Sequence, residues 1–339
     1  MSGNSRIRNK GVFGIHHVTA ITSSPQKNVD FYTGELGLRL VKLTVNQDDP
    51  TAYHLYFGDE AGRPGTILTF FHWPNIPRGH RGTSQVVSAS FLIPKHSIDY
   101  WVDRFKSKEI EFTGPYYRFG NEQVITFHDP DGLELELVAN ASAGDRNVNT
   151  WKDGPIPVKD SIRGFYSVTL SEEGYEQTAS VLTDELGFRP TQRDGSRFRY
   201  EASAISTGKE QEGVGGARIV DVLCLPYTQQ GTIGIGSVHH VAFRTPSDDE
   251  QMVLRRNIVS AGLNATPVID RFYFHSVYFR EPGGVLFEIA TNPPGFAVDE
   301  KPEELGTHLV LPPWLESMRS ELTRILPPVV YPKVQLKDR

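Results

Sequence analysis

The sequence has very little cysteine: one residue, Cys224, in a chain of 339. A single thiol excludes a framework of internal disulfides and is typical of proteins that stay in the reducing cytoplasm. No apolar stretch reaches the roughly 18 residues that a membrane span requires, and the N-terminal segment has no apolar core of signal-peptide length. We therefore expect a cytoplasmic protein without a membrane partner.

The sequence also lacks an excess of basic residues. Its net charge is −6, and like charges form no long block, so a nucleic-acid partner is not expected. There is no P-loop, no dinucleotide-binding glycine fingerprint and no Gly-x-Ser-x-Gly nucleophile elbow. Hydrophobic residues make up 38% of the chain and charged residues 22%, as in a globular protein with a buried core.

What the sequence does contain is a repeat. Residues 14–40 align with residues 164–190, and residues 87–140 align without a gap with residues 239–292. Each repeated unit opens with a short alternating strand, continues through a helical stretch and ends in three further strands. The period predicts an α+β protein built from βαβββ units.

The predicted units are grouped along the chain in two pairs. The four units span residues 14–82, 83–150, 160–230 and 236–296. They divide the chain into residues 1–150 and 151–296, with a linker rich in Asn, Asp, Gly and Pro over residues 141–159. Residues 297–339 form a C-terminal extension with an amphipathic helix that ends before Pro327. The predicted apolar face of that helix holds Trp314, Leu315, Met318, Leu322, Ile325 and Leu326.

Comparison of the units isolates three candidate metal ligands. The equivalent positions of the four first strands hold His17, Ser88, Ser167 and His240, and the last strands of units two and four hold Glu136 and Glu288. Two histidines and one carboxylate are the ligand set of non-haem Fe(II) oxygenases, so we predict that His17, His240 and Glu288 bind one metal ion. Glu136 has no histidine in its own set, and we interpret it as a relic or a structural ion pair.

Several motifs together resemble a known family. The segments GIHHVTAIT, PGTILTFFHWP, SVHHVAFRTP, DRFYFHSVYFREPGGVLFEIAT and LGTHLVLPPWLE are similar to those of the vicinal-oxygen-chelate superfamily, which includes glyoxalases and extradiol dioxygenases. Within it the chain most resembles the ring-cleaving hydroquinone 1,2-dioxygenases. The resemblance implies two cup-shaped mixed sheets, an Fe(2+) cofactor with Mn(2+) as an alternative, and O₂ and a small aromatic diol as substrates. Ring substituents and a homo-oligomeric state are left open.

The resemblance also implies how the units pair. Two units make one cup, and the three candidate ligands come from units one and four, so these two units must share a cup. Units two and three, with Ser88 and Ser167, are then left to form the other cup. The alternative pairs units in chain order and would separate His17 from Glu288.

The same resemblance places further residues around the metal or against the substrate: Tyr278, His239, Arg271, Thr19 and His16. Strand alternation puts Thr19 on the face of His17 but turns His16 and His239 away, unless the strands bulge. Arg271 and Tyr278 would share a face only if a turn or bulge lies between them. The remaining histidines named next are expected to be loop or core residues: His54, His72, His80, His128 and His308.

Two other functions remain open. A glyoxalase-like lyase or isomerase usually has a fourth protein ligand, whose natural place in the last strand of unit one is occupied by Thr69. A non-enzymatic protein that binds or confers resistance to a small aromatic compound would be favoured by loss of a ligand, and all three ligands are present.

Overall fold

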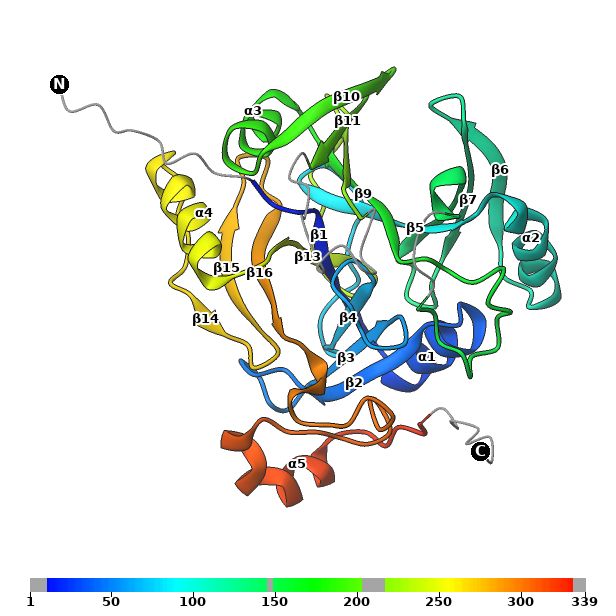
Figure 1. Cartoon of the computed structure of the whole chain (residues 1–339), viewed down its shortest axis with the longest axis vertical. Coiled ribbons are helices and arrows are strands. Elements are labelled where there is room, and N and C mark those ends of the chain that lie inside the picture. Colours follow the sequence, from blue (N-terminus) through cyan, green and yellow to red (C-terminus); the bar gives the residue numbers. More distant parts are fainter. Residues whose placement is uncertain (1–10, 145–148, 203–216, 332–339) are drawn as a thin grey trace.

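The chain folds into two eight-stranded mixed sheets with short helices on their outer sides (Figure 1). The computed structural model describes residues 11–144, 149–202 and 217–331. The first sheet has the order β14-β15-β16-β13-β1-β4-β3-β2, and the second has the order β10-β11-β12-β9-β5-β8-β7-β6. The predicted α+β fold of βαβββ units in two cup-shaped sheets is therefore confirmed.

The strands of the first sheet are β1 (Ile15–Thr22), β2 (Arg39–Val45), β3 (Tyr53–Gly58), β4 (Ile67–His72), β13 (Val238–Thr245), β14 (Ile269–Asp270), β15 (Phe274–Arg280) and β16 (Leu286–Pro294). Those of the second sheet are β5 (Gln85–Pro94), β6 (Phe112–Arg118), β7 (Glu122–His128), β8 (Glu134–Asn140), β9 (Phe165–Glu172), β10 (Phe188–Asp194), β11 (Arg197–Ala202) and β12 (Ile219–Cys224). The α-helices are α1 (Pro25–Val29), α2 (Ile98–Ser107), α3 (Glu176–Ser180), α4 (Asp248–Ser260) and α5 (Arg319–Ile325).

The strand order confirms that the units do not pair along the chain. Units one and four meet where β1 runs antiparallel to β13, and units two and three meet where β5 runs antiparallel to β9. The proposed division into residues 1–150 and 151–296 stays a prediction, and residues 145–148 of the predicted linker lie outside the described part. Each sheet thus combines strands from both halves of the sequence.

Paired bulges mark the two central strand pairs. Between β1 and β13 the register shifts at His16 on one strand and at His239 on the other. Between β5 and β9 it shifts at Val87 and Tyr166, which are the repeat mates of His239 and His16. A bulge inserts one extra residue and re-aims the side chains around it. The bulges therefore belong to the repeat itself and not to one site.

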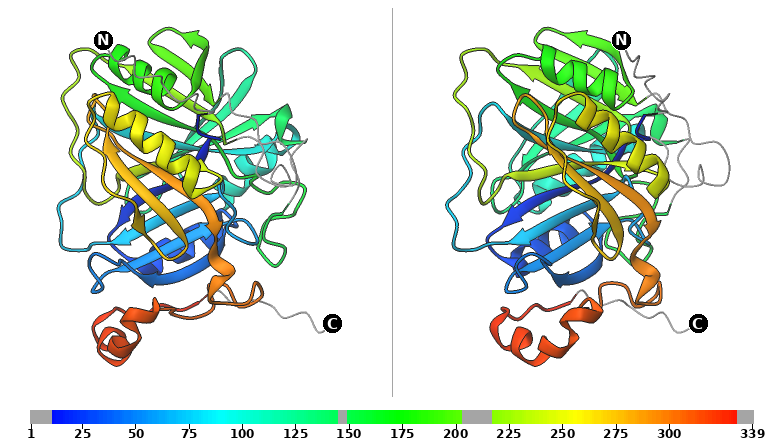
Figure 2. Two further views of the ribbon diagram at one scale, coloured as in Figure 1. Left: turned by 60° about the vertical axis from the view of Figure 1, so that its left-hand side comes forward. Right: turned by 90° about the vertical axis from the view of Figure 1, so that its left-hand side faces the viewer.

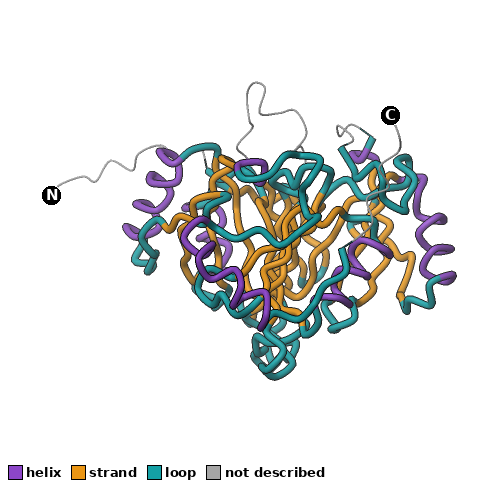
Figure 3. Tube along the Cα trace, turned by 90° about the horizontal axis from the view of Figure 1, so that it is seen from below, coloured by secondary structure: helices purple, strands orange, loops and turns teal. Residues whose placement is uncertain are grey.

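The helices cover the outer faces of the sheets. Helix α4 lies across the strands of unit four (Figure 2), and buried Gln251 holds it there by donating to the carbonyls of His275 and Ile289 at 2.8 Å. Viewed from below, helices line the periphery and strands fill the centre (Figure 3). Helix α1 begins as its sequence indicates, because the Ser24 side chain accepts a hydrogen bond from the Lys27 amide and Pro25 follows it.

The C-terminal extension differs in part from its prediction. The segment 313–325 is a 3₁₀ helix (Pro313–Met318) followed by the short α5, below β2 and β3 in Figure 1. Three of the six predicted apolar residues are buried: Leu315, Leu322 and Leu326. The other three, Trp314, Met318 and Ile325, are 39–52% exposed, because the change in helix type leaves only a narrow stripe against the sheet.

Membrane-spanning helices were not expected from the sequence. Within the described residues, no helix is long and apolar enough to cross a membrane.

Candidate metal centre

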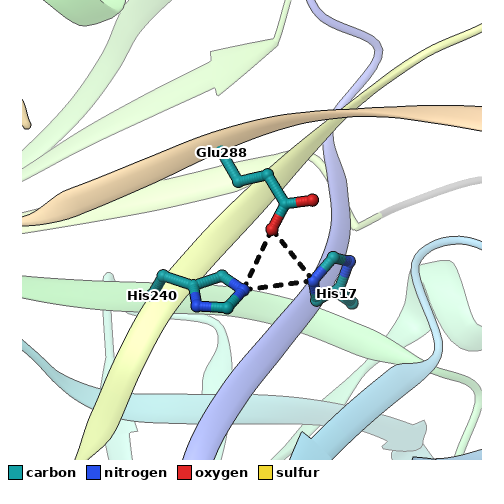
Figure 4. Close-up of side chains that lie close together, drawn as sticks. All are labelled: His17, His240 and Glu288. Atoms are coloured by element: carbon teal, nitrogen blue, oxygen red, sulfur yellow. Dashed lines mark hydrogen bonds and ion pairs between the residues drawn. The ribbon is translucent and has the colours of Figure 1, made fainter. Parts of the chain in front are cut away.

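Three buried side chains converge in the first sheet. His17 comes from β1, His240 from β13 and Glu288 from β16, and all three are at most 3% exposed (Figure 4). The Nε2 atoms of the histidines lie 3.3 Å apart, and Glu288 Oε2 is 3.3 Å from His17 Nε2 and 3.0 Å from His240 Nε2. In the described part of the chain, this is the one group of three or more acidic, histidine or cysteine side chains compact enough to hold a metal ion.

The donor atoms suit one divalent ion. Separations of this size fit three ligands of one centre, since metal–nitrogen and metal–oxygen bonds are about 2.0–2.2 Å long. Glu288 Oε1 accepts a hydrogen bond from Ser276 Oγ at 2.5 Å, whereas the buried Oε2 has no hydrogen-bond partner. Burial by itself raises the pKa of Glu288, but the two histidines hold that pKa well below its ordinary value, so the carboxylate is ionised. An ionised, unsatisfied oxygen beside two imidazole nitrogens fits a cation.

Each candidate histidine ligand is supported by the histidine before it. His16 Nδ1 lies 2.9 Å from His17 Nδ1, and His239 Nδ1 lies 2.8 Å from His240 Nδ1. These contacts exist because both strands bulge at the first histidine. Strand alternation had turned His16 and His239 away from the site unless such a bulge was present. If His17 and His240 bind a metal through Nε2, their Nδ1–H groups donate to His16 and His239 and fix both ring orientations.

The position for a fourth ligand is held by a threonine. In the parallel pairing of β13 and β16, Ala242 lies opposite Glu288, and in the equivalent pairing of β1 and β4, Thr19 lies opposite Thr69. Thr69 is therefore the structural mate of Glu288. Its hydroxyl donates to Thr19 Oγ1 at 2.9 Å and meets His54 Nε2 at 2.8 Å. The protein places hydrogen-bonding hydroxyls where a fourth ligand would stand.

A small pocket lies against the triad. Its lining includes His17, His240 and Thr19, as strand alternation predicts for Thr19, and also Arg271 and Tyr278. The last two meet because the backbone turns between them: Phe272 has a φ of +68°, and the pairing of β15 with β16 shifts register after Phe274. His16 and His239 are not among the lining residues of the described chain.

Arg271 is already paired. Its guanidinium makes two hydrogen bonds with Asp48, at 2.9 and 3.0 Å, and lies 5.5 Å from the centre of the Tyr278 ring. Burial and Glu288 raise the pKa of Tyr278 above its ordinary value, so its phenol is a neutral donor. Burial lowers the pKa of His239 to about 3, which keeps that imidazole neutral.

Sequence reasoning missed part of this pocket. His54, expected to be a loop or core residue, lies in the pocket wall beside Tyr56 and Phe71, and Asn46, Gln47 and Asp48 line its rim. No local motif marks His54. Its one signal is alternation with Tyr56 on β3, which becomes informative only when the register of three strands is known.

The second sheet holds a different structure at the equivalent positions. Glu136, the mate of Glu288, accepts hydrogen bonds from Arg118 at 2.9 and 3.1 Å and from Ser90 at 2.5 Å. Asp221, the mate of Thr69 in unit three, is bound by Arg199 at 2.8 Å. These charged side chains are at most 5% exposed, and Glu122 bridges the two arginines. Glu136 is thus a structural ion pair, one of the two interpretations offered for it.

The comparisons with known proteins agree with this architecture. Residues 14–137 match the family model described as Glyoxalase/Bleomycin resistance protein/Dioxygenase superfamily. The chain is 43% identical to a Bacillus subtilis (strain 168) protein provisionally named ring-cleaving dioxygenase MhqO, over 94% of this chain and 97% of that one. It is 35% identical to a chlorohydroquinone/hydroquinone 1,2-dioxygenase of Sphingobium indicum, over 93% of this chain and 96% of that one.

A solved structure extends the likeness to three dimensions. The crystal structure of a provisionally named dioxygenase from Bacillus subtilis superposes with a TM-score of 0.86 at 42% identity, covering 94% of this chain and 98% of that chain. Identity at this level over nearly the whole length, together with the paired sheets described above, establishes the family. The chain belongs to the glyoxalase, bleomycin-resistance and dioxygenase superfamily, among the relatives named ring-cleaving dioxygenases.

Proposed function

We propose that this protein is a non-haem Fe(II) dioxygenase that opens the ring of a hydroquinone-type substrate with O₂. The observation that carries the proposal is the convergence of His17, His240 and Glu288, with Thr69 where a fourth protein ligand would stand. Two histidines and one carboxylate leave several coordination positions open for substrate and oxygen. The names of the relatives support the ring-cleaving reaction and the hydroquinone class.

The metal would contribute one part of the chemistry. When bound, Fe(II) supplies a Lewis acid that favours an ionised substrate hydroxyl and a redox centre for reaction with O₂. The reaction consumes one O₂ and one hydroquinone. It breaks the ring bond between a hydroxylated carbon and its neighbour, and both oxygen atoms enter the product.

The protein's own side chains would supply the rest. Tyr278, a neutral phenol in the pocket wall, would donate a proton to a substrate oxygen. Arg271 would stabilise the anion that develops on the ring-opened product. His16 and His239 each contact a candidate ligand ring through Nδ1. If His239 takes part in proton transfer, it would therefore do so through its Nε2 atom.

The decisive test combines metal analysis with oxygen uptake. Protein purified without oxygen and reconstituted with Fe(II) should bind about one iron per chain. It should consume O₂ with hydroquinone, methylhydroquinone or a chlorohydroquinone. Mn(II) should be assayed in parallel because it accepts the same ligand set. Uptake with catechol alone would overturn the substrate class but leave the oxygenase standing.

Other outcomes would select the other functions. Nickel or zinc as the native metal, with no O₂ uptake on any diol, would favour a glyoxalase-like lyase or isomerase. Absence of a metal, with tight binding of an aromatic compound, would favour a binding or resistance protein. The cytoplasmic location, the lack of a nucleic-acid partner and the oligomeric state stay predictions.

A further inference from the structure

A row of side chains crosses four strands of the first sheet and ends at the candidate metal centre. Tyr56 on β3 lies opposite Thr69 on β4, Thr69 lies opposite Thr19 on β1, and Thr19 lies opposite His240 on β13. His54, on the same face of β3, bridges the first two. Its Nδ1 is 2.9 Å from the Tyr56 hydroxyl and its Nε2 is 2.8 Å from Thr69 Oγ1.

The hydrogen bonds of this row have one direction. Thr69 Oγ1 donates its only proton to Thr19 Oγ1, so it must accept from His54 Nε2–H. A neutral imidazole with its proton on Nε2 has an acceptor at Nδ1, and the Tyr56 hydroxyl must then donate to it. The chain therefore runs from Tyr56 through His54 and Thr69 to Thr19, each member donating to the next.

Burial favours the neutral state that this direction requires. Tyr56 is 3% exposed, and Thr69 and Thr19 are fully buried. Burial, followed by the nearby His17 and His240 rings, lowers the pKa of His54 well below its ordinary value. The Tyr56 ring lies 4.0 Å from that of His54, and Phe71 packs against it at 4.5 Å, so the imidazole is held in place.

The direction decides what Thr19 can do. Its oxygen accepts one hydrogen bond, from Thr69, and among the described residues this is the only hydrogen bond that Thr19 Oγ1 makes. Its own hydroxyl proton is left over, in a pocket that it shares with His17 and His240. A threonine held in this way still has its own hydroxyl proton to donate.

We propose that His54, through Thr69, positions Thr19 as a hydrogen-bond donor beside the candidate metal centre, and that this donor selects an ionised phenolic oxygen over a neutral hydroxyl. The inference rests on the proposed function, because it assigns a determinant of substrate recognition to that same site. His54 is a positioning residue and does not touch the substrate. A hydroxyl that donates to an anion forms a stronger bond than one that meets a neutral oxygen.

The test uses Zn(II)-loaded protein and nitrohydroquinone. Zinc has no redox chemistry, so the probe binds without turnover, and its absorbance reports whether the bound phenol is ionised. His54→Phe and Thr69→Val should each raise the Kd roughly 10- to 100-fold, the range expected for one hydrogen bond to a charged group. Each should also raise the apparent pKa of the bound phenol. The double variant should resemble either single one, because both remove the same interaction.

Three comparisons separate a positioning role from a structural one. His54→Gln retains an N–H donor toward Thr69 and should recover most of the affinity. Tyr53→Phe is the matched control, since Tyr53 lies on the same strand but donates to the carbonyl of Pro327 at 2.9 Å, outside the chain of hydrogen bonds. It should leave Kd and phenol ionisation unchanged. Nitrogen NMR of the ligand-free zinc protein should show His54 neutral with its proton on Nε2.

The outcomes distinguish this inference from the proposed function. Unchanged Kd and phenol ionisation in His54→Phe, or a proton on His54 Nδ1, would overturn the directed chain while leaving the dioxygenase proposal intact. If the wild-type zinc protein bound no nitrohydroquinone and the Fe(II) form consumed no O₂, the proposed function itself would fail. The NMR tautomer would then still show whether the hydrogen bonds run from Tyr56 to Thr19.

Discussion

Two glutamates at the same repeat position have opposite chemistry in this molecule. Glu288 Oε2 faces two imidazole nitrogens and has no hydrogen-bond partner, whereas Glu136 is neutralised by the guanidinium of Arg118. A guanidinium has a permanent charge and fixed donors, so it satisfies a buried carboxylate without a metal. The second cup thus uses an arginine at the point where the first offers a site for an ion.

This difference predicts how matched variants behave. Glu288→Gln should remove most of the bound metal and the activity while the fold is retained, because the core does not depend on the ion. Glu136→Gln should leave metal content unchanged but lower the free energy of unfolding by about 3–5 kcal/mol, the usual effect of leaving a buried charge unpaired. Metal analysis and denaturant unfolding of both variants measure the two effects. A loss of metal in Glu136→Gln would contradict the assignment.

At the residue scale, the sequence predicted the three candidate ligands but only part of the pocket around them. His17 and His240 stand out because their mates are Ser167 and Ser88, so comparison of the units was enough. His54 has no such contrast. Its partners Tyr56, Thr69 and Thr19 come from strands whose register depends on packing, and no spacing along the chain reveals it.

At the scale of elements, the loop between β2 and β3 and the turn before β15 close one side of the pocket together. Asp48 holds Arg271 with two hydrogen bonds, and Gln47 donates to the Arg271 carbonyl at 2.9 Å. The Asp48 side chain is 71% exposed and that of Arg271 17% exposed. The pair therefore orients an arginine of the site from the solvent side.

We predict that Asp48→Asn changes catalysis more than stability. An ion pair this exposed contributes about 0–1 kcal/mol, so the melting temperature should shift little. Arg271 would lose its anchor, and the KM for hydroquinone should rise several-fold with a smaller change in kcat. Steady-state oxygen uptake and a thermal melt test both parts. Asp49→Asn, next in the same loop, is the control and should leave KM unchanged, because Asp49 bonds within its own turn to Thr51. An unchanged KM in Asp48→Asn would contradict the role of Asp48 in orienting Arg271.

Elements were predictable where a local signal was strong. The alternating segments marked the first strands, such as β1. The C-terminal segment was only partly predictable. Its apolar residues suggested one broad face, but a 3₁₀ turn precedes α5 and changes which residues point inward. The bulges at His16 and His239 were named only as the condition under which these two side chains could approach the candidate ligands. A single sequence does not reveal an inserted residue in a strand.

At the scale of the whole molecule, the pairing of units one and four followed from the ligands together with the resemblance, which implies that two units make one cup. Three ligands of one ion must meet, and the repeat placed them in the first and last units. The same logic could not foresee the contacts that join the two sheets, two of which are made by turns before the last strands. In one, Asp131 accepts hydrogen bonds from Thr22 and Ser23 at the end of β1. In the other, Glu172 at the end of β9 lies against Gly283, in the turn before β16.

The second of these contacts places two carboxyl groups close together. Glu172 and Glu281 are 1% and 2% exposed, and a Cβ on Gly283 would lie 2.2 Å from Glu172 Oε2. Glu281 accepts from Thr178 and from the amides of Gly283 and Val285, whereas Glu172 Oε1 has no hydrogen-bond partner. Glu281 is thus the member whose hydrogen bonds are satisfied, and Glu172 is the group that takes up a proton.

Stability should therefore depend on the pH through Glu172. Burial, and then the charge of Glu281, raise the pKa of Glu172 to about 8 from an ordinary value of 4.5. The folded protein holds this proton where the unfolded chain has lost it. The contribution of Glu172 to the free energy of unfolding is therefore complete below about pH 4.5 and is lost as the pH rises toward 8.

Glu172→Gln mimics the protonated state. Its free energy of unfolding should be higher than that of the wild type by a few kcal/mol at pH 8 and similar at pH 4.5. Denaturant unfolding across this range measures the difference between the two proteins, in which the contributions of groups that do not interact with Glu172 cancel. A difference that did not change with pH would show that Glu172 is ionised in the folded protein, and that the contact between the sheets tolerates two negative charges.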